Sequence, residues 1–253
     1  MKRAVILAGL ILFGCIATAS GDTSEDQKKY WGLRALAEEG DVASQYKLGT
    51  MYYTGEGVRA DDQKAAEWYR KAAEQGHPKA QNSLGNMYYN GYGIPKDYQK
   101  AVMWYRRAAE QGHVGAQFNL GIHYYDGKGV TKDYHEAAKW FRRAAEQGHV
   151  GAQFNLGIQY YDGKGLAKDY HEAAKWFRKA AEQGDADAQN NLGTMYYNGY
   201  GVPKDDQKAV MWYRKAAEQG DADAKRNLAN MYNEGQAASP KPAQAKPGVS
   251  TSR

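Results

Sequence analysis

The sequence predicts an all-α protein built as a solenoid of antiparallel helix pairs. A Leu-Gly pair recurs every 36 residues, a glycine-rich turn recurs with it, and the apolar residues between the turns follow helical spacing. The leucines of the pair are Leu48, Leu84, Leu120, Leu156 and Leu192, and a sixth copy at Leu228 is followed by Ala229. A period of this length is typical of identical supersecondary units that stack on one another and share a continuous core.

The first helix of a unit is illustrated by residues 78–90. Ala80 and Leu84 are four residues apart and therefore lie on one helical face. Gly85 stands inside this helix, where glycine costs roughly 1 kcal/mol relative to alanine. Its recurrence in every complete unit therefore predicts a close helix–helix contact. The turn at residues 90–93 contains two glycines suited to positive φ, which ends the helix.

The second helix of the same unit begins after Asp97, because aspartate favours the N-cap position. Tyr105 shares one face of this helix with several alanines, which allow two helices to approach closely. The helix ends at Gly112, and in the next unit Asp133 and Glu136 have the spacing of a capping box. Each unit is therefore expected to be an antiparallel helix pair.

Five complete units are expected within a solenoid that spans residues 22–235. A lone second-type helix near residues 24–39 precedes them and a lone first-type helix near residues 221–233 follows, so we interpret both as end caps. These degenerate ends favour a monomer. Residues 236–253 are rich in Ala, Pro, Lys and Ser without apolar periodicity, so we expect a disordered tail.

Residues 1–19 are typical of a secretory signal peptide, with two basic residues, a short apolar stretch and an A-x-A cleavage pattern at residues 17–19. Residues 12–15 also resemble a lipoprotein cleavage site, so lipid attachment at Cys15 is the alternative. We expect the protein in the periplasm, with secretion or lipid anchoring as alternatives. The apolar stretch is too short for a permanent membrane span, so none is expected in the mature chain.

The formal net charge of +5 comes from the two chain ends. Lys2, Arg3, Lys241, Lys246 and Arg253 account for the whole excess, so the body of the chain is neutral. A nucleic-acid-binding module needs a basic face on the fold itself. We therefore expect no nucleic-acid partner.

The units share the pattern A-x-x-x-L-G-x-x-Y-x-x-G-x-G-V-x-x-D-x-x-x-A-x-x-W-Y-x-x-A-A-x-x-G. In one unit its residues are Ala80, Leu84, Gly85, Tyr88, Gly91, Gly93, Asp97, Ala101, Trp104, Tyr105, Ala108, Ala109 and Gly112. This pattern resembles the Sel1-like repeat, a relative of the tetratricopeptide repeat. The resemblance implies a right-handed α-superhelix, a concave groove lined mainly by first helices, and an adaptor that binds proteins without chemistry of its own.

An asparagine stands directly before the repeated leucine at four positions, Asn119, Asn155, Asn191 and Asn227, of which the last precedes Leu228-Ala229. In the related tetratricopeptide family this position often faces the groove. An amide offers a donor and an acceptor to a peptide backbone, so we interpret this column as a ladder for an unstructured peptide. A solvated helix face or a contact between repeats is the alternative.

Neighbouring columns of the expected groove differ between units. The central units carry Phe118 and Phe154 where the outer units have asparagine, and His123 and Gln159 where others have methionine. An apolar centre between polar ends is how binding hot spots are often arranged. The two central units are near-copies, however, so a recent duplication explains the shared phenylalanines equally well.

No metal site, cofactor or catalytic group is expected. His77, His113 and His149 share one column, but equivalent residues of successive repeats lie roughly 8–10 Å apart and cannot converge on one zinc ion. Turn carboxylates such as Asp126 and Asp162 interchange with asparagine between units, which a general acid would not tolerate. We therefore predict a non-enzymatic envelope scaffold that holds a protein or peptide. A host-contact factor and a weak β-lactam or cell-wall hydrolase are the alternatives.

Overall fold

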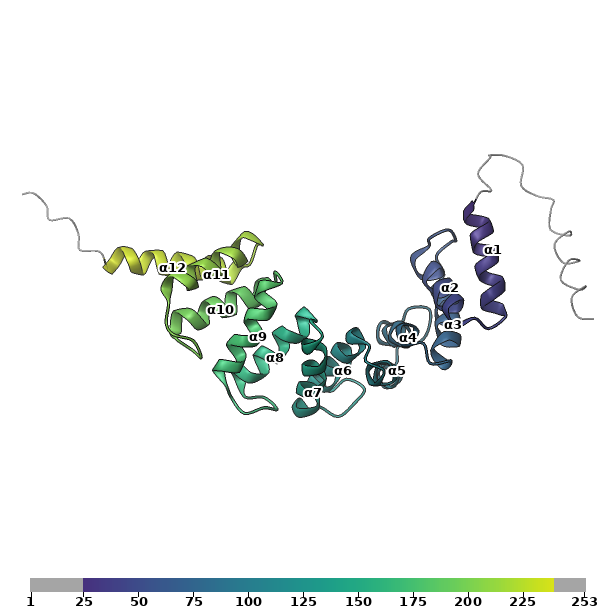
Figure 1. The fold of residues 1–253 in the computed structure, drawn as a ribbon, viewed down its shortest axis with the longest axis horizontal. Coiled ribbons are helices and arrows are strands. Elements are labelled where there is room, and N and C mark those ends of the chain that lie inside the picture. Colours follow the sequence, from purple (N-terminus) through teal and green to yellow (C-terminus); the bar gives the residue numbers. More distant parts are fainter. Residues whose placement is uncertain (1–24, 239–253) are drawn as a thin grey trace, which may run out of the picture.

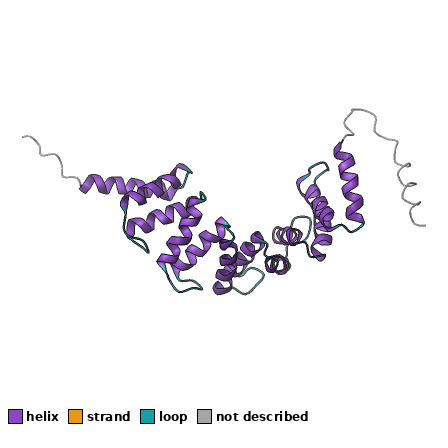
Figure 2. Ribbon diagram, viewed as in Figure 1, coloured by secondary structure: helices purple, strands orange, loops and turns teal. Residues whose placement is uncertain are grey.

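The computed structural model describes residues 25–238, which form twelve α-helices and no strands (Figures 1 and 2). The helices are α1 (Glu25–Glu38), α2 (Val42–Thr54), α3 (Asp62–Glu74), α4 (Pro78–Asn90), α5 (Tyr98–Glu110), α6 (Val114–Asp126), α7 (Tyr134–Glu146), α8 (Val150–Asp162), α9 (Tyr170–Glu182), α10 (Ala186–Asn198), α11 (Asp206–Glu218) and α12 (Ala222–Ala238). The predicted signal peptide, Cys15 and most of the predicted tail lie outside the described residues.

The helices alternate between the two types that the sequence predicted, and together they form an arc (Figure 1). Even-numbered helices are first helices and odd-numbered helices are second helices, with α1 and α12 as the flanking half-units. Each helix packs mainly against the helices directly before and after it in the chain. In the middle of the arc, α4 and α6 lie nearer its inner side than α5 and α7 (Figure 1).

Helix boundaries follow the predicted caps. The side chain of Asp97 accepts a hydrogen bond from the Lys100 N–H at 2.9 Å, and α4 ends at Gly91 with φ of +82°. The last helix is longer than the helix expected near residues 221–233, since α12 continues to Ala238. The reason is that Ala237 stands where the earlier turns have their second glycine.

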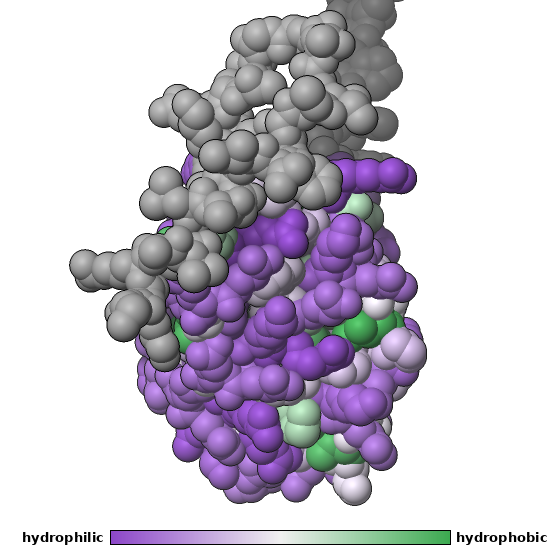
Figure 3. Space-filling view, turned by 90° about the vertical axis from the view of Figure 1, so that its right-hand side faces the viewer, coloured by the Kyte–Doolittle hydropathy of each residue, from purple (hydrophilic) through white to green (hydrophobic). Residues whose placement is uncertain are grey.

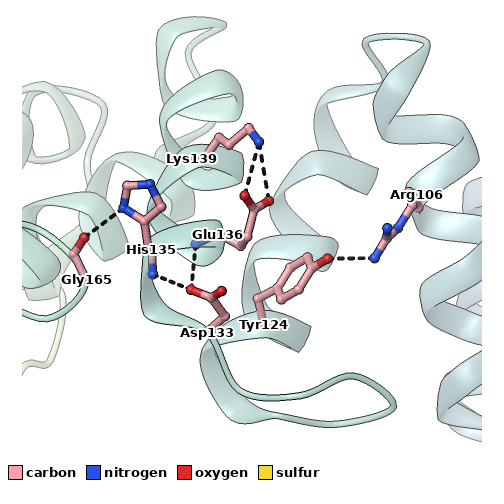
Figure 4. A network of polar contacts seen from close by, with 7 residues as sticks. All are labelled: Arg106, Tyr124, Asp133, His135, Glu136, Lys139 and Gly165. Atoms are coloured by element: carbon pink, nitrogen blue, oxygen red, sulfur yellow. Dashed lines mark hydrogen bonds and ion pairs between the residues drawn. The ribbon is translucent and has the colours of Figure 1, made fainter.

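Half of the predicted capping box forms at the start of α7 (Figure 4). The Asp133 carboxylate accepts hydrogen bonds from the backbone N–H groups of His135 and Glu136, at 2.9 and 3.0 Å. Glu136 does not reach back to Asp133, and its carboxylate instead pairs with Lys139 at 3.1 Å. The Asp133 N–H already donates to the Tyr124 carbonyl at 2.9 Å, so it needs no partner from Glu136.

The glycine of the Leu-Gly pair in each complete first helix faces an aromatic ring of the following second helix. A Cβ built on Gly121 would lie 2.6 Å from ring carbons of Phe141, well inside van der Waals contact. The other four glycines meet rings in the same way, in the pairs Gly49–Tyr69, Gly85–Tyr105, Gly157–Phe177 and Gly193–Tyr213. The close helix–helix contact predicted from the repeated glycine is therefore confirmed.

A buried glutamine, not predicted from the sequence, links each unit to its neighbour by hydrogen bonds. Gln117 is 4% exposed, and its amide nitrogen donates to the Ala109 carbonyl at 3.2 Å while its amide oxygen accepts from Gln147 at 2.7 Å. Gln45, Gln81, Gln153 and Gln189 repeat this arrangement. Arg106 adds a second tie between units by donating to the Tyr124 hydroxyl at 2.6 Å (Figure 4).

Each end of the arc carries a lysine at a position that is buried in complete units, and both ends also expose apolar side chains, among them Trp31, Leu36 and Tyr232. The face shown in Figure 3, which looks onto the α1 end, is mostly hydrophilic with separate apolar spots. Lys29 and Lys225 occupy the positions of the buried Ala65 and Gln189. A further stacked unit would have to bury these charges, which is costly without partners. Within the described part of the chain, no helix has the length and apolar character needed to cross a bilayer.

Candidate binding surface

The centre of the arc presents apolar side chains from two neighbouring first helices. Phe118 and Ile122 on α6 and Phe154 and Ile158 on α8 are half-buried, so part of each side chain meets solvent. We call these four residues the apolar strip. The equivalent positions of α4 and α10 are polar: Asn82, Asn86, Asn190 and Thr194. The arrangement agrees with the predicted apolar centre between polar ends.

The ring of Phe118 is held by the next unit rather than projecting freely. It stacks on the His149 imidazole with ring centroids 4.4 Å apart and lies 5.9 Å from the Phe141 ring. Gly151 leaves room for it, since a Cβ there would lie 3.2 Å from the Phe118 ring. The ring centroid of Phe154 lies at the same distance, 5.9 Å, from that of Phe177 on α9. A surface held in this way loses little side-chain freedom on binding.

A hollow of about 340 Å³ opens between α4 and α6 beside the apolar strip. Its lining consists of Asn86, Tyr89, Asn90, Tyr105, Phe118, Asn119, Ile122 and His123. Ring faces and amide groups together suit a side chain of a bound polypeptide, which could pack on the rings and hydrogen-bond the amides. Tyr89 was not among the residues predicted to line the groove, although a Tyr-Tyr pair near the end of each complete first helix signals a repeated role.

The asparagine column serves contacts within the solenoid. The Asn119 side chain donates to the Asn82 side chain at 3.2 Å, and Asn227 donates to Asn190 at 3.0 Å. Asn155 and Asn191 instead donate to the carbonyls of Gly151 and Asp187 in their own helices. All four side chains stay half-buried rather than fully enclosed. Their predicted contact with a peptide therefore stays a prediction.

Six consecutive matches to the model of the Sel1 repeat cover residues 42–77, 78–113, 114–149, 150–185, 186–221 and 222–246. The chain belongs to the Sel1 repeat family. No protein of curated function matches it. The predicted family is thereby confirmed, along with the helix-pair solenoid that it implied.

Two solved structures are similar to this Sel1 repeat protein. One is a protective antigen of uropathogenic Escherichia coli with an SLR fold, with 44% identity, a TM-score of 0.78, and coverage of 81% of this chain and 44% of the antigen. This chain therefore spans less than half the length of that antigen. The other is a Sel1 repeat protein from Oxalobacter formigenes, with 38% identity, a TM-score of 0.74, and coverage of 82% and 88% of the two chains.

Two residues assigned to the groove of this Sel1 repeat protein from its sequence are in fact buried. His123 reaches the floor of the hollow but is only 2% exposed, and its Nδ1 lies 2.6 Å from the Lys128 carbonyl oxygen. Burial lowers the pKa of His123, which favours the neutral imidazole. Gln159 is completely buried, and its amide nitrogen donates to the Tyr134 carbonyl at 3.0 Å. The prediction that Gln159 lines an open groove is wrong, whereas His123 lines the hollow with only a small part of its side chain exposed.

The histidine column formed by His77, His113 and His149 has a structural role in three Sel1 repeats. The Nδ1 atoms of His77, His113 and His149 accept hydrogen bonds from backbone N–H groups three residues later, at 3.2, 3.1 and 3.2 Å. They are therefore N-caps, as Asp185 is in a later repeat. Burial lowers the pKa of all three imidazoles, which keeps Nδ1 free to accept.

Proposed function

We propose that this Sel1 repeat protein is a non-enzymatic scaffold that holds a protein or peptide segment against the inner face of its arc. The observation that carries the proposal is the apolar strip. Its rings are fixed by neighbouring side chains, yet each keeps an apolar edge open to solvent between polar first helices. Apolar surface rimmed by polar residues is typical of interaction sites, and a solenoid extends such a surface over several repeats.

Replacing the two rings of the strip tests this proposal. The variant Phe118→Asn/Phe154→Asn carries the residue that α4 and α10 already have at this position, so the solenoid should fold. Partners captured from an envelope extract by the unaltered chain would be purified, and their affinity measured by titration calorimetry. We expect the variant to lose at least about tenfold in affinity, the size of a modest hot-spot loss.

The matched control is Lys139→Ala/Lys175→Ala, which removes two exposed side chains from second helices, each paired with a glutamate of its own helix. This control should bind the partner as the unaltered chain does. A Phe118→Asn/Phe154→Asn variant with full affinity would contradict the proposal. Turnover of a chromogenic β-lactam by the unaltered chain would instead support the hydrolase alternative.

The place of action is also a proposal. Residues 1–19 favour export to the periplasm, and the degenerate end units favour a monomer. The 44% identity to a protective antigen favours a second candidate, an exposed factor that contacts a host. Because this chain spans 44% of that antigen, the likeness concerns only part of it. Fractionation followed by protease treatment of intact cells separates the two locations.

A further inference from the structure

Charge is unevenly distributed along the first helices. Four aspartates gather at the starts of α10 and α12, namely Asp185, Asp187, Asp221 and Asp223. Asp185 and Asp221 cap their helices, accepting from backbone N–H groups at 2.7 and 2.6 Å. Burial raises the pKa of Asp187, and the negative charges of the other three carboxylates raise it further. The four carboxylates therefore lie close enough to one another to interact.

The repeat geometry places this acidic cluster beside the apolar strip. Phe118 stacks on His149 and lies against Gly151. The residues one repeat later are Phe154, Asp185 and Asp187, so Phe154 borders the aspartates as Phe118 borders His149 and Gly151. An apolar edge and carboxylates are thus offered to the same ligand.

The opposite side of the strip has the opposite charge. The position of Asp187 and Asp223 is held by Lys79 in α4 and by glycine in the two central repeats. Burial is the main cause that lowers the pKa of His113, and the positive charge of Lys79 lowers it further. Arg226 pairs with Asp223 at 2.6 Å and neutralises part of the charge of the cluster. Among the described residues, Asp187 forms no ion pair. The starts of the first helices therefore carry a lysine on the α4 side of the strip and four aspartates on the α10 side, where Arg226 lies beside them.

From this pattern we infer that the partner segment has a defined chemistry: apolar side chains that rest on the Phe118–Phe154 strip, directly followed by Lys or Arg side chains that meet Asp187 and its neighbours. The inference rests on the proposed function and adds to it the class of ligand. Complementary charges at the edge of an apolar contact contribute more to specificity and to orientation than to total affinity. Basic residues on the α10 side would thus set the direction in which the segment lies.

Three labelled heptapeptides of equal length serve as probes, because the natural partner is unidentified. One is basic and apolar (Gly-Gly-Phe-Gly-Leu-Lys-Arg), one is acidic and apolar (Gly-Gly-Phe-Gly-Leu-Glu-Asp), and one is basic without apolar side chains (Gly-Gly-Ser-Gly-Ser-Lys-Arg). Fluorescence anisotropy with the full chain measures their binding. We expect the first probe to bind about tenfold more tightly than either of the others, and its binding to weaken as salt is raised.

Two charge variants locate the contact. Asp187→Asn/Asp223→Asn should weaken the basic and apolar probe about fivefold, which corresponds to the loss of two exposed ion pairs. Glu136→Gln/Glu172→Gln removes the same charge from second helices and should leave binding unchanged. Neither aspartate accepts the capping bond of its helix, so the first variant should fold.

Several outcomes would overturn the inference. Equal binding of the basic and acidic probes, both weakened by Phe118→Asn/Phe154→Asn, would remove the charge preference and keep the binding surface. Binding that depends on the aspartates but not on the phenylalanines, or no binding of any probe, would remove the proposed ligand class. Tighter binding by a chain ending at Ala238 would assign the site to the basic residues of the chain's own tail, Lys241, Lys246 and Arg253.

These results are distinguishable from failure of the proposed function. That function fails when a purified natural partner binds Phe118→Asn/Phe154→Asn with full affinity, whatever the probes do. The ligand class fails when the partner depends on the phenylalanines but not on Asp187 and Asp223.

Discussion

Replacing Gly121 with alanine should destabilise the solenoid by about 1–2 kcal/mol, although alanine is the better helix former. A Cβ at this position would lie 2.6 Å from two carbons of the Phe141 ring. Carbon atoms in good contact lie about 3.5–4.0 Å apart, so helix and ring would have to separate by about 1 Å. Phe141 is completely buried and also packs near Phe118, which leaves its ring little freedom to retreat.

Two terms of opposite sign set this magnitude. Overpacking a well-filled core costs about 1–3 kcal/mol, and the upper half of that range applies because both partners are buried. Replacing glycine by alanine within a helix stabilises the helix by about 1 kcal/mol. The difference is the expected net loss, and it is measured by urea denaturation followed by far-ultraviolet circular dichroism and tryptophan fluorescence.

Gly115→Ala in the same helix is the matched control. A Cβ there would meet only the His113 ring, at an ordinary 3.5 Å, so this variant should gain up to about 1 kcal/mol. Combining Gly121→Ala with Phe141→Leu should recover at least about 0.5 kcal/mol beyond additivity, because leucine lacks the ring atoms that clash. A Gly121→Ala chain as stable as the Gly115→Ala chain would refute the reasoning.

Two further predictions concern buried polar groups. Gln117→Leu should lower the free energy of unfolding by about 0.5–1.5 kcal/mol, because the Ala109 carbonyl loses one of its two donors and keeps the Gly112 N–H; urea denaturation measures the loss. The histidine caps should make stability fall with acidity. Burial lowers the pKa of His77, His113 and His149, so the folded chain binds protons less readily than the unfolded chain. Their contribution is complete above the unfolded-state pKa of about 6.5 and is lost as pH falls through the lowered folded-state values. Replacing all three with aspartate should shift that loss to more acidic pH, as seen in denaturation midpoints measured from neutral to acidic pH.

Each of these predictions has a result that contradicts it. Unchanged stability of Gln117→Leu would mean that the glutamine bonds only replace bonds to water. Unchanged acid sensitivity after replacement of the three caps would assign the sensitivity to His123, whose pKa burial also lowers.

Much of the fold follows from local residue patterns. The helix at residues 78–90, the Asp97 cap and the contact at the helix glycine were all predictable, because each depends on residues close in sequence or repeated at a fixed period. The end of α12 was not. It depends on Ala237, which replaces the second glycine of a turn, and a single replaced residue carries little signal.

The surface was less predictable, because burial depends on which face of a first helix meets its neighbours. His123 and Gln159 share a column with Met87 and Met195, which are also buried. The methionines therefore marked this column as core. A backbone carbonyl meets one nitrogen of each polar side chain in it, whereas Gln159 Oε1 has no hydrogen-bond partner within the described residues. The position of Phe118 could be predicted correctly because other repeats have asparagine there. Such an exchange is expected only where the side chain is partly exposed.

The buried glutamines have a consequence for how the length of this protein can change. Gln117 bonds a residue 8 positions earlier and another 30 positions later, and Arg106 bonds Tyr124 18 positions later. The same offsets recur from unit to unit, so a block of 36 residues can be duplicated or deleted with every such partner replaced by an identical one. The number of repeats therefore sets the length of the solenoid. The near-identical central pair indicates that a repeat has been duplicated before, and each added block would lengthen the inner face by one repeat.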